Sequence, residues 1–405
     1  MSYLESRFLR ERKLPDKNQH FITASNHGLQ FSNCSDAFQP HPQYILLTMS
    51  QSIVQEQSNL KVAHLETIDF AKLLAHEEHE VAKLMSACTT AGFFYVNLQG
   101  QSSRGLLEDE DSMYKAMEEF FDQPLDTKMQ DDRGTHKHGY KPAGVFAGVK
   151  AHTRDNYETL KVARDEIGAN SPLLPSTVKK HPRLFDDFIS KSHLVTMTIM
   201  HSLSNALGAN PANRLEQHHR DHADSNTTLV LLRYPKNLSS TCVGHNQHTD
   251  IGSLTLLFSK QWGLQLVNPE TEEWEWVAPR PGHAIINVGD SLRFLTDKRL
   301  ASCMHRVVPT PETATQNRYS IAYFLRPEND IEYKDPEGKP ISAKEWHDNK
   351  YKTFAESHEK QAMNSILMGG MDRLAKTAPA GITYATPSAY AASPFDASSA
   401  APATP

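Results

Sequence analysis

The stretch Gly244–Phe258, GHNQHTDIGSLTLLF, places three potential metal ligands directly before a short apolar run. In an extended strand, residues two apart point to the same face, so His248 and Asp250 can reach one ion while Thr249 faces away. His245 lies three residues before His248 and therefore falls out of this register. The sequence thus predicts a pair of ligands, one imidazole and one carboxylate, at the start of a β-strand.

A third ligand has to come from a more distant part of the chain, and the candidate is His305 in SCMHRVVP. Two imidazoles and one carboxylate on one side of an ion form the facial triad, which leaves coordination positions open on Fe(II). The same donors also suit a catalytic zinc ion, so a zinc hydrolase is an alternative, although the chain has no HExxH motif. A second HxD occurs in HHRDH at residues 218–222, and we expect this polar segment to be a solvated linker.

The chain after residue 225 consists of short runs rich in Val, Ile, Leu and aromatic residues, separated by Gly, Pro, Asn and Asp. Such closely spaced short strands are typical of a sandwich or barrel. Within this region, Gly289 and Asp290 predict a turn before a further strand. The runs expected to form strands are TTLVLLRYP, SLTLLF, LQLVN, EWEWVAP, HAIINVG, SLRFLT, HRVVP and RYSIAYFL.

Residues 60–224 have a different pattern, in which helical periodicity dominates. Apolar residues recur at helical intervals over residues 73–85, then around residues 105–122 and 181–207, where a glycine stands near the expected end of the helix. The run GFFYVNL predicts a strand between the first two helices. We therefore expect an α/β part here, followed by a β-rich core with a C-terminal helix over residues 225–371.

Both ends of the chain lack the patterns of a folded domain. Residues 1–59 show no sustained period of 3.6 or 2, which predicts a poorly ordered N-terminal extension. Residues 372–405 consist mainly of Ala, Pro, Ser and Thr, which cannot bury enough apolar surface to offset the entropy of ordering. This tail is expected to be disordered.

The last predicted strand, NRYSIAYFL, carries a candidate anion site. Strand alternation places Arg318, Ser320, Ala322 and Phe324 on one face. A guanidinium can bind a carboxylate through two hydrogen bonds, and the hydroxyl two residues later can donate another. The alternative is an arginine that pairs with a structural Asp or Glu.

Overall composition excludes several classes of function. The 42 basic and 48 acidic residues give a formal charge of -6 without a dense basic cluster, so we expect no nucleic-acid partner. No apolar run reaches the length needed to span a bilayer, and the charged N-terminus is unlike a signal peptide, which predicts a cytoplasmic protein without a membrane partner. The four cysteines form no CxxC pair, which argues against a disulfide framework.

With HTD, the distal HRV and the RYS tripeptide identified, the chain resembles the Fe(II)/2-oxoglutarate dioxygenases of the isopenicillin N synthase-like superfamily. The resemblance covers about residues 60–355 and includes TIDF, AGFFYV, GYKPAGV, NYETLKVARDE, LLRYP and SAKEWHDNKY in order. It implies an α+β fold with a mainly β core, a double-stranded β-helix or jelly roll backed by helices. Residues 225–371 would then form the Fe(II)/2-oxoglutarate core.

The resemblance also implies which residues hold the cofactors. His248, Asp250 and His305 would bind Fe(II), and the enzyme would use 2-oxoglutarate and O₂ to hydroxylate, desaturate or cyclise a small molecule. Because members of this family often act on secondary metabolites, this substrate is expected to be a secondary metabolite. The sequence does not indicate an oligomeric state.

The co-substrate residues implied by the resemblance are Arg318 and Ser320, which would hold the distal carboxylate of 2-oxoglutarate, and Tyr234 in LLRYP, which would hydrogen-bond it. Leu232 stands where the plant members usually carry Asn. LLRYP is closer to isopenicillin N synthase, whose Arg and Ser hold the carboxylate of the substrate. An oxidative cyclase that uses O₂ without 2-oxoglutarate is therefore one alternative, and a non-catalytic binding protein on the same fold is another.

Overall fold

The structure is a computed structural model that describes residues 61–135, 137–147, 153–221, 223–236, 244–308, 310 and 315–371. All of these residues belong to one compact unit. The predicted N-terminal extension (residues 1–59) and C-terminal tail (residues 372–405) lie outside the described residues.

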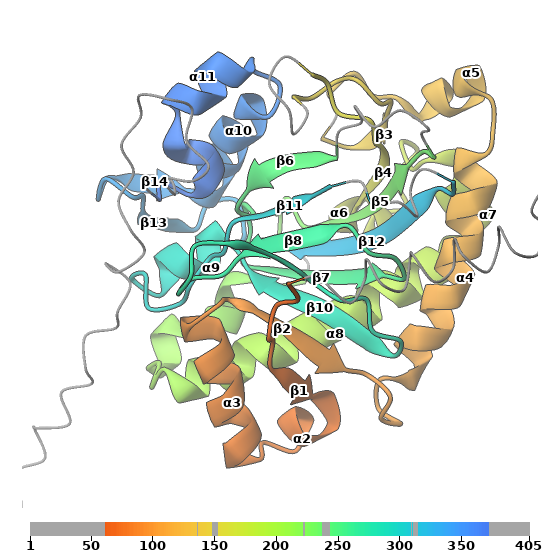
Figure 1. Ribbon diagram of the computed structural model, residues 1–405. Helices are drawn as coiled ribbons and strands as arrows, with labels where there is room; N and C mark the ends of the chain where they lie inside the picture. Colours follow the sequence, from red (N-terminus) through yellow and green to blue (C-terminus); the bar gives the residue numbers. More distant parts are fainter. Residues whose placement is uncertain are drawn as a thin grey trace, which may run out of the picture. The chain divides into compact units, whose positions relative to one another are not determined.

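Two β-sheets form the centre of the molecule, with the smaller sheet lying over one face of the larger one (Figure 1). The larger sheet has the order β1 (Thr67–Asp69), β2 (Phe93–Asn97), β10 (His283–Val288), β7 (Leu254–Ser259), β12 (Arg318–Leu325), β5 (Thr228–Tyr234), β4 (Glu158–Ala163) and β3 (Gly139–Lys141). The smaller sheet has the order β6 (His245–His248), β11 (His305–Val307), β8 (Leu264–Val267) and β9 (Trp274–Trp276). Only β1 and β2 pair in parallel; every other pairing between these strands is antiparallel.

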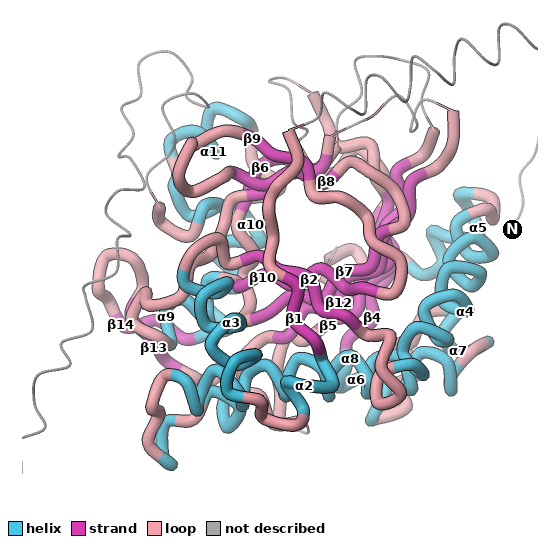
Figure 2. The backbone as a smooth tube through the Cα atoms, turned by 60° about the horizontal axis from the view of Figure 1, so that its bottom comes forward, coloured by secondary structure: helices cyan, strands magenta, loops and turns pink. Residues whose placement is uncertain are grey.

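Helices cover the outer face of the larger sheet (Figure 2). The longest, α8, packs against α2, α3 and α4, and its apolar face belongs to the main core together with the outward-facing residues of the sheet. The helices before the smaller sheet are α2 (Phe70–Leu74), α3 (Glu78–Thr89), α4 (Arg104–Phe121), α5 (Leu125–Lys128), α6 (Arg164–Gly168), α7 (Ser176–Lys180) and α8 (Pro182–Ala206), with short 3₁₀ turns η1 (Met129–Asp131), η2 (Pro211–Asn213) and η3 (Leu215–His218).

The C-terminal part closes one end of the two sheets. A two-stranded hairpin leads into helices beside β6, and 3₁₀ turn η5 contacts both β6 and α10. These elements are β13 (Glu332–Lys334), β14 (Pro340–Ser342), α10 (Ala343–Thr353), α11 (His358–Met363) and η5 (Ser365–Met368). Among the described residues, no helix combines the length and the apolar character that crossing a bilayer requires.

The two faces of β12 separate as the alternation predicted. Ile321 and Tyr323 belong to the main core under the helices, whereas Ala322 and Phe324 belong to a second apolar cluster between the sheets. Side chains on this inner face can therefore line a site between the two sheets.

The prediction of a strand at SLRFLT was wrong, because these residues form helix α9 (Asp290–Leu295). A short apolar run is compatible with a buried strand or a buried helix, and tertiary contacts decide between them. Here the Asp290 N–H donates to the carbonyl oxygen of Asp250 at 2.8 Å, and the Phe294 ring packs edge-on against Trp346 of α10. The helix thus ties the loop that carries Asp250 to the C-terminal helix.

Candidate metal centre

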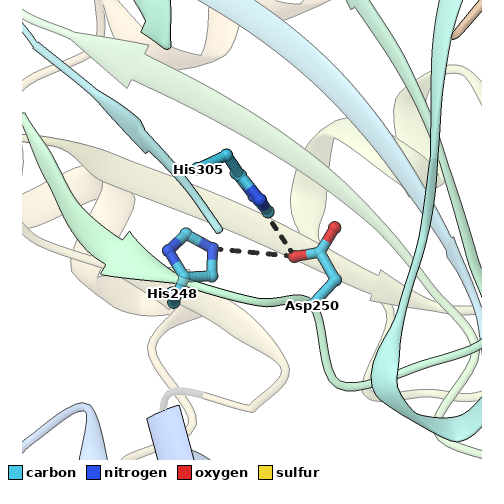
Figure 3. Close-up of side chains that lie close together, drawn as sticks. All are labelled: His248, Asp250 and His305. Carbon is cyan, nitrogen blue, oxygen red and sulfur yellow. Dashed lines mark ion pairs between the residues drawn. The ribbon is translucent and has the colours of Figure 1, made fainter. Parts of the chain in front are cut away.

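Three elements bring the predicted metal ligands together between the sheets (Figure 3). His248 is the last residue of β6, Asp250 follows in the loop towards β7, and His305 begins β11 directly opposite His248 in the antiparallel pair. One carboxylate oxygen, Oδ1 of Asp250, lies 3.6 Å from Nε2 of His248 and 3.7 Å from Nε2 of His305. All three ligand atoms lie within 4.8 Å of one another, and all three residues are buried.

The second nitrogen of each imidazole is fixed by the backbone. Nδ1 of His248 donates to the carbonyl oxygen of Asn246 at 2.7 Å, and Nδ1 of His305 donates to that of Cys303 at 3.2 Å. A carbonyl can only accept, so the neutral form of either ring carries its proton on Nδ1, and the lone pair of Nε2 then faces the centre. Such contacts fix both the tautomer and the orientation of a metal-ligating imidazole.

The carboxylate of Asp250 is oriented in the same way. Its Oδ2 accepts hydrogen bonds from Oγ1 of Thr255 at 2.5 Å and from Nδ2 of Asn287 at 2.7 Å, which leaves Oδ1 directed at the two imidazoles. Burial acts to raise the pKa of Asp250, but the neighbouring His305 and His248 and the Asn287 hydrogen bond hold that pKa well below its usual range. Asp250 is therefore an anion at neutral pH.

These donors fit a divalent iron. Burial lowers the pKa of His305 to about 4, so this imidazole is neutral and can donate its lone pair at neutral pH. Two imidazole nitrogens and one carboxylate oxygen converge from one side, which is the donor set of a facial triad.

The predicted co-substrate residues form a second group on β12 and β5. Arg318 is 1% exposed and lies opposite Tyr234 in the strand pair, with its guanidinium carbon 5.0 Å from the centre of the Tyr234 ring. Its Nε donates to the carbonyl oxygen of Trp262 at 2.9 Å, and one terminal nitrogen donates to Oγ of Ser259 at 3.1 Å. Ser320 is buried on the same face, two residues along β12. A carboxylate bound here would meet a desolvated guanidinium.

Known proteins provide an independent comparison. A model of the 2OG-Fe(II) oxygenase superfamily matches residues 225–327, and a model described as the non-haem dioxygenase in morphine synthesis N-terminal region matches residues 65–182. The 2-oxoglutarate-dependent dioxygenase frbH of Dothideomycetidae sp. (strain 11243) is 40% identical over 321 residues, which cover 79% of this chain and 99% of that protein. The chain belongs to the 2OG-Fe(II) oxygenase superfamily.

Two further comparisons agree with this assignment. The 2-oxoglutarate-dependent dioxygenase iboH of Amanita muscaria is 56% identical over 204 residues, which cover 50% of this chain and 99% of iboH. The crystal structure of a full-length Neurospora crassa protein in complex with alpha-KG superposes with a TM-score of 0.58 at 23% identity and covers 69% of this chain and 93% of that one. The predicted α+β jelly-roll fold is confirmed, and the enzyme is a 2-oxoglutarate- and Fe(II)-dependent dioxygenase that consumes O₂. The alternative without 2-oxoglutarate is not favoured.

His245 of this oxygenase does not lie where the sequence predicted. The expectation that it leaves the register of His248 was wrong, because the two rings stack with their centres 4.3 Å apart. His245 pairs with Val307 and His248 with His305, so β6 has one residue more than β11 between these pairs. This bulge returns His245 to the side of His248. Burial lowers the pKa of His245 well below its usual value.

The HHRDH segment of the oxygenase is only partly the solvated linker that the sequence predicted, because Arg220 and Asp221 are exposed whereas His219 is buried. His219 is 2% exposed, with Nδ1 bonded to the carbonyl oxygen of Leu215 at 2.7 Å and Nε2 to Oγ of Ser253 at 2.7 Å. Both ring nitrogens are therefore used within the protein core. The histidine serves to hold η3 against the start of β7.

A cavity that the sequence did not indicate borders the metal centre. It is lined by His248 and Asp250, by apolar side chains, and by Lys161 of β4 and Arg326 just after β12. Continued alternation from Arg318 along the last strand could have indicated that Arg326 lies on the same inner face. Nothing in the sequence indicated Lys161, because its position depends on how β4 pairs with β5.

Proposed function

We propose that His248, Asp250 and His305 hold the Fe(II) of this oxygenase, and that Arg318 and Ser320 bind the distal carboxylate of 2-oxoglutarate. The observation that carries the proposal is the convergence of three ligand atoms within 4.8 Å, with the other polar atom of each side chain held by a hydrogen bond. Fe(II) with 2-oxoglutarate activates O₂ for oxidation of a carbon centre, with release of succinate and CO₂.

The residues of the chain contribute position and exclusion of water. Asn246 and Cys303 keep the imidazoles in the ligating tautomer, and Thr255 and Asn287 keep one oxygen of the carboxylate out of the centre. Arg318 would supply bidentate recognition of a planar carboxylate. The Tyr234 ring lies against the guanidinium of Arg318, and we propose that its hydroxyl hydrogen-bonds the same ligand.

The substrate proposed for this centre is a small organic molecule that enters the cavity beside His248 and Asp250. Its walls include Tyr157, Val230 and Leu232, which are buried and would exclude water from the reacting carbon. The outcome would be hydroxylation, desaturation or ring formation, according to the carbon that the walls present to the centre.

Anaerobic calorimetric titration with Fe(II) tests the ligand assignment. We expect His305→Ala to weaken Fe(II) binding by more than about 100-fold, because a residue that binds the metal directly contributes more than the residues that orient it. His245→Ala is the matched control, since His245 is partly buried and stacks on His248 but lies outside the triad. The assignment is wrong if His305→Ala binds Fe(II) like the wild type, or if His245→Ala loses binding to the same degree.

A further inference from the structure

The cavity beside the metal centre has an unusual charge. Among the described residues that line it, Lys137, Lys161 and Arg326 carry basic side chains, whereas the only acidic one is the metal ligand Asp250. Lys137 forms an ion pair with Asp348 at 2.6 Å. Within the described part of the chain, Arg326 forms no ion pair with a carboxylate.

The guanidinium of Arg326 is held in place, but not all of its hydrogen-bond donors have an acceptor among the described residues. One terminal nitrogen donates to the carbonyl oxygen of Asn226, and the guanidinium lies 5.0 Å from the centre of the Phe324 ring. Its Nε is buried and has no hydrogen-bond partner among the described residues. A buried donor without an acceptor is costly, so this position favours a ligand that brings an acceptor.

Lys161 approaches the same part of the cavity from β4. Its Nζ donates to the hydroxyl of Tyr351 at 2.5 Å and lies over the rings of Tyr351 and Phe146, at 4.8 and 5.8 Å from their centres. Burial lowers the pKa of Lys161 well below its usual value, and the charges of Lys141 and Arg326 lower it further. An anion bound beside both side chains would favour the charged form of Lys161 and offset its repulsion from Arg326.

Further unsatisfied polar atoms lie in the same cavity. Nδ1 of His138 and Oγ1 of Thr159 are buried without a hydrogen-bond partner among the described residues, and both residues line the cavity. Thr159 lies two residues before Lys161 on β4, so strand alternation places both side chains on the inner face. The cavity therefore offers a polar end with several hydrogen-bonding groups beside apolar walls.

We propose that the substrate of this oxygenase is a small carboxylic acid whose carboxylate binds Arg326 and Lys161 while its carbon skeleton extends towards His248 and Asp250. This inference rests on the proposed function of the metal centre. It assigns two separate carboxylate sites to the inner face, since Arg318 begins β12 and Arg326 directly follows its last residue, eight positions later. Arg318 binds the co-substrate and Arg326 the substrate.

Anaerobic calorimetry on the full chain loaded with Fe(II) and saturating 2-oxoglutarate tests this proposal. The probes are short straight-chain mono- and dicarboxylic acids and the proteinogenic amino acids, each compared with its primary amide. We expect at least one acid to bind and its amide to bind about 10- to 100-fold more weakly, since the amide cannot form charge-assisted hydrogen bonds. The proposal is overturned if no acid binds or if acids and amides bind equally.

Variants locate the site. Arg326→Met and Lys161→Met are each expected to weaken binding of that acid by about 10-fold or more, with Arg326→Lys intermediate and the exposed Lys339→Met unchanged. Each variant should still bind 2-oxoglutarate, as shown by the visible charge-transfer band of the Fe(II) complex. Loss of the band in Arg326→Met would overturn the proposal by placing the co-substrate there, whereas absence of the band in the wild type would refute the proposed function instead.

Discussion

Replacement of Lys350 by methionine should destabilise the protein more than any surface change. Nζ of Lys350 lies 2.5 Å from Oδ2 of Asp290 and 2.6 Å from Oγ1 of Thr249, and the Lys350 and Asp290 side chains are both 0% exposed. Methionine fills the space of the lysine stem but leaves the buried carboxylate without its counterion. Breaking one partner of such a pair costs about 3–5 kcal/mol. Because Thr249 stands between two metal ligands, Fe(II) affinity should fall as well.

Urea unfolding of the metal-free protein measures this effect. The matched control is Lys344→Met on the same helix, whose ammonium group is exposed and whose ion pair with the half-buried Asp348 should contribute less than about 1 kcal/mol. The double variant Lys350→Met/Asp290→Asn removes both charges and should recover about 1 kcal/mol or more of the loss. The reasoning is refuted if the free energies of unfolding of Lys350→Met and Lys344→Met differ by less than about 1 kcal/mol. It is also refuted if the double variant is no more stable than Lys350→Met.

Three further predictions concern the surroundings of the site. Thr255→Val removes a hydrogen bond to Asp250 and should weaken Fe(II) binding by about 10- to 100-fold in an anaerobic titration, with near-native affinity as the contrary result. Gly289→Ala would place a Cβ 2.3 Å from the carbonyl oxygen of Gly252 and should cost about 1–3 kcal/mol in urea unfolding, whereas Gly168→Ala, which meets open space, should not. Burial lowers the pKa of His219 to about 4, below its unfolded value of about 6.5, so the unfolded state binds more protons and stability should fall as the pH drops from about 6.5 to about 4. His219→Gln should make the unfolding free energy depend less on pH over this range. An unchanged slope would contradict the role of His219 in this pH dependence.

The sequence predicted those features that depend on local periodicity. Strands β5, β7 and β12 match short apolar runs, and the two faces of β12 follow simple alternation. The ligands His248 and Asp250 could be chosen because HTD stands before a strand. His305 could be named as the distant candidate, but nothing local pairs it with residues more than fifty positions earlier, so its position opposite His248 could not be predicted.

Features that depend on packing could not be predicted in this way. The helix at Asp290–Leu295 is fixed by a lysine sixty residues later, and no window of sequence contains both charges. The place of His245 depends on one extra residue in β6 relative to β11, which a strict period of two does not anticipate. The cationic end of the cavity requires β4 and β12 to face the same space, which is a property of the sheet order.

The most direct measurement of the central claim is an anaerobic titration of the Fe(II)-loaded protein with 2-oxoglutarate, followed through the visible metal-to-ligand charge-transfer band. The account predicts a saturable band in the wild type, no band in His248→Ala, and about 10-fold or greater weakening of 2-oxoglutarate binding in Arg318→Met. No band in the wild type, or unchanged affinity in Arg318→Met, would contradict it.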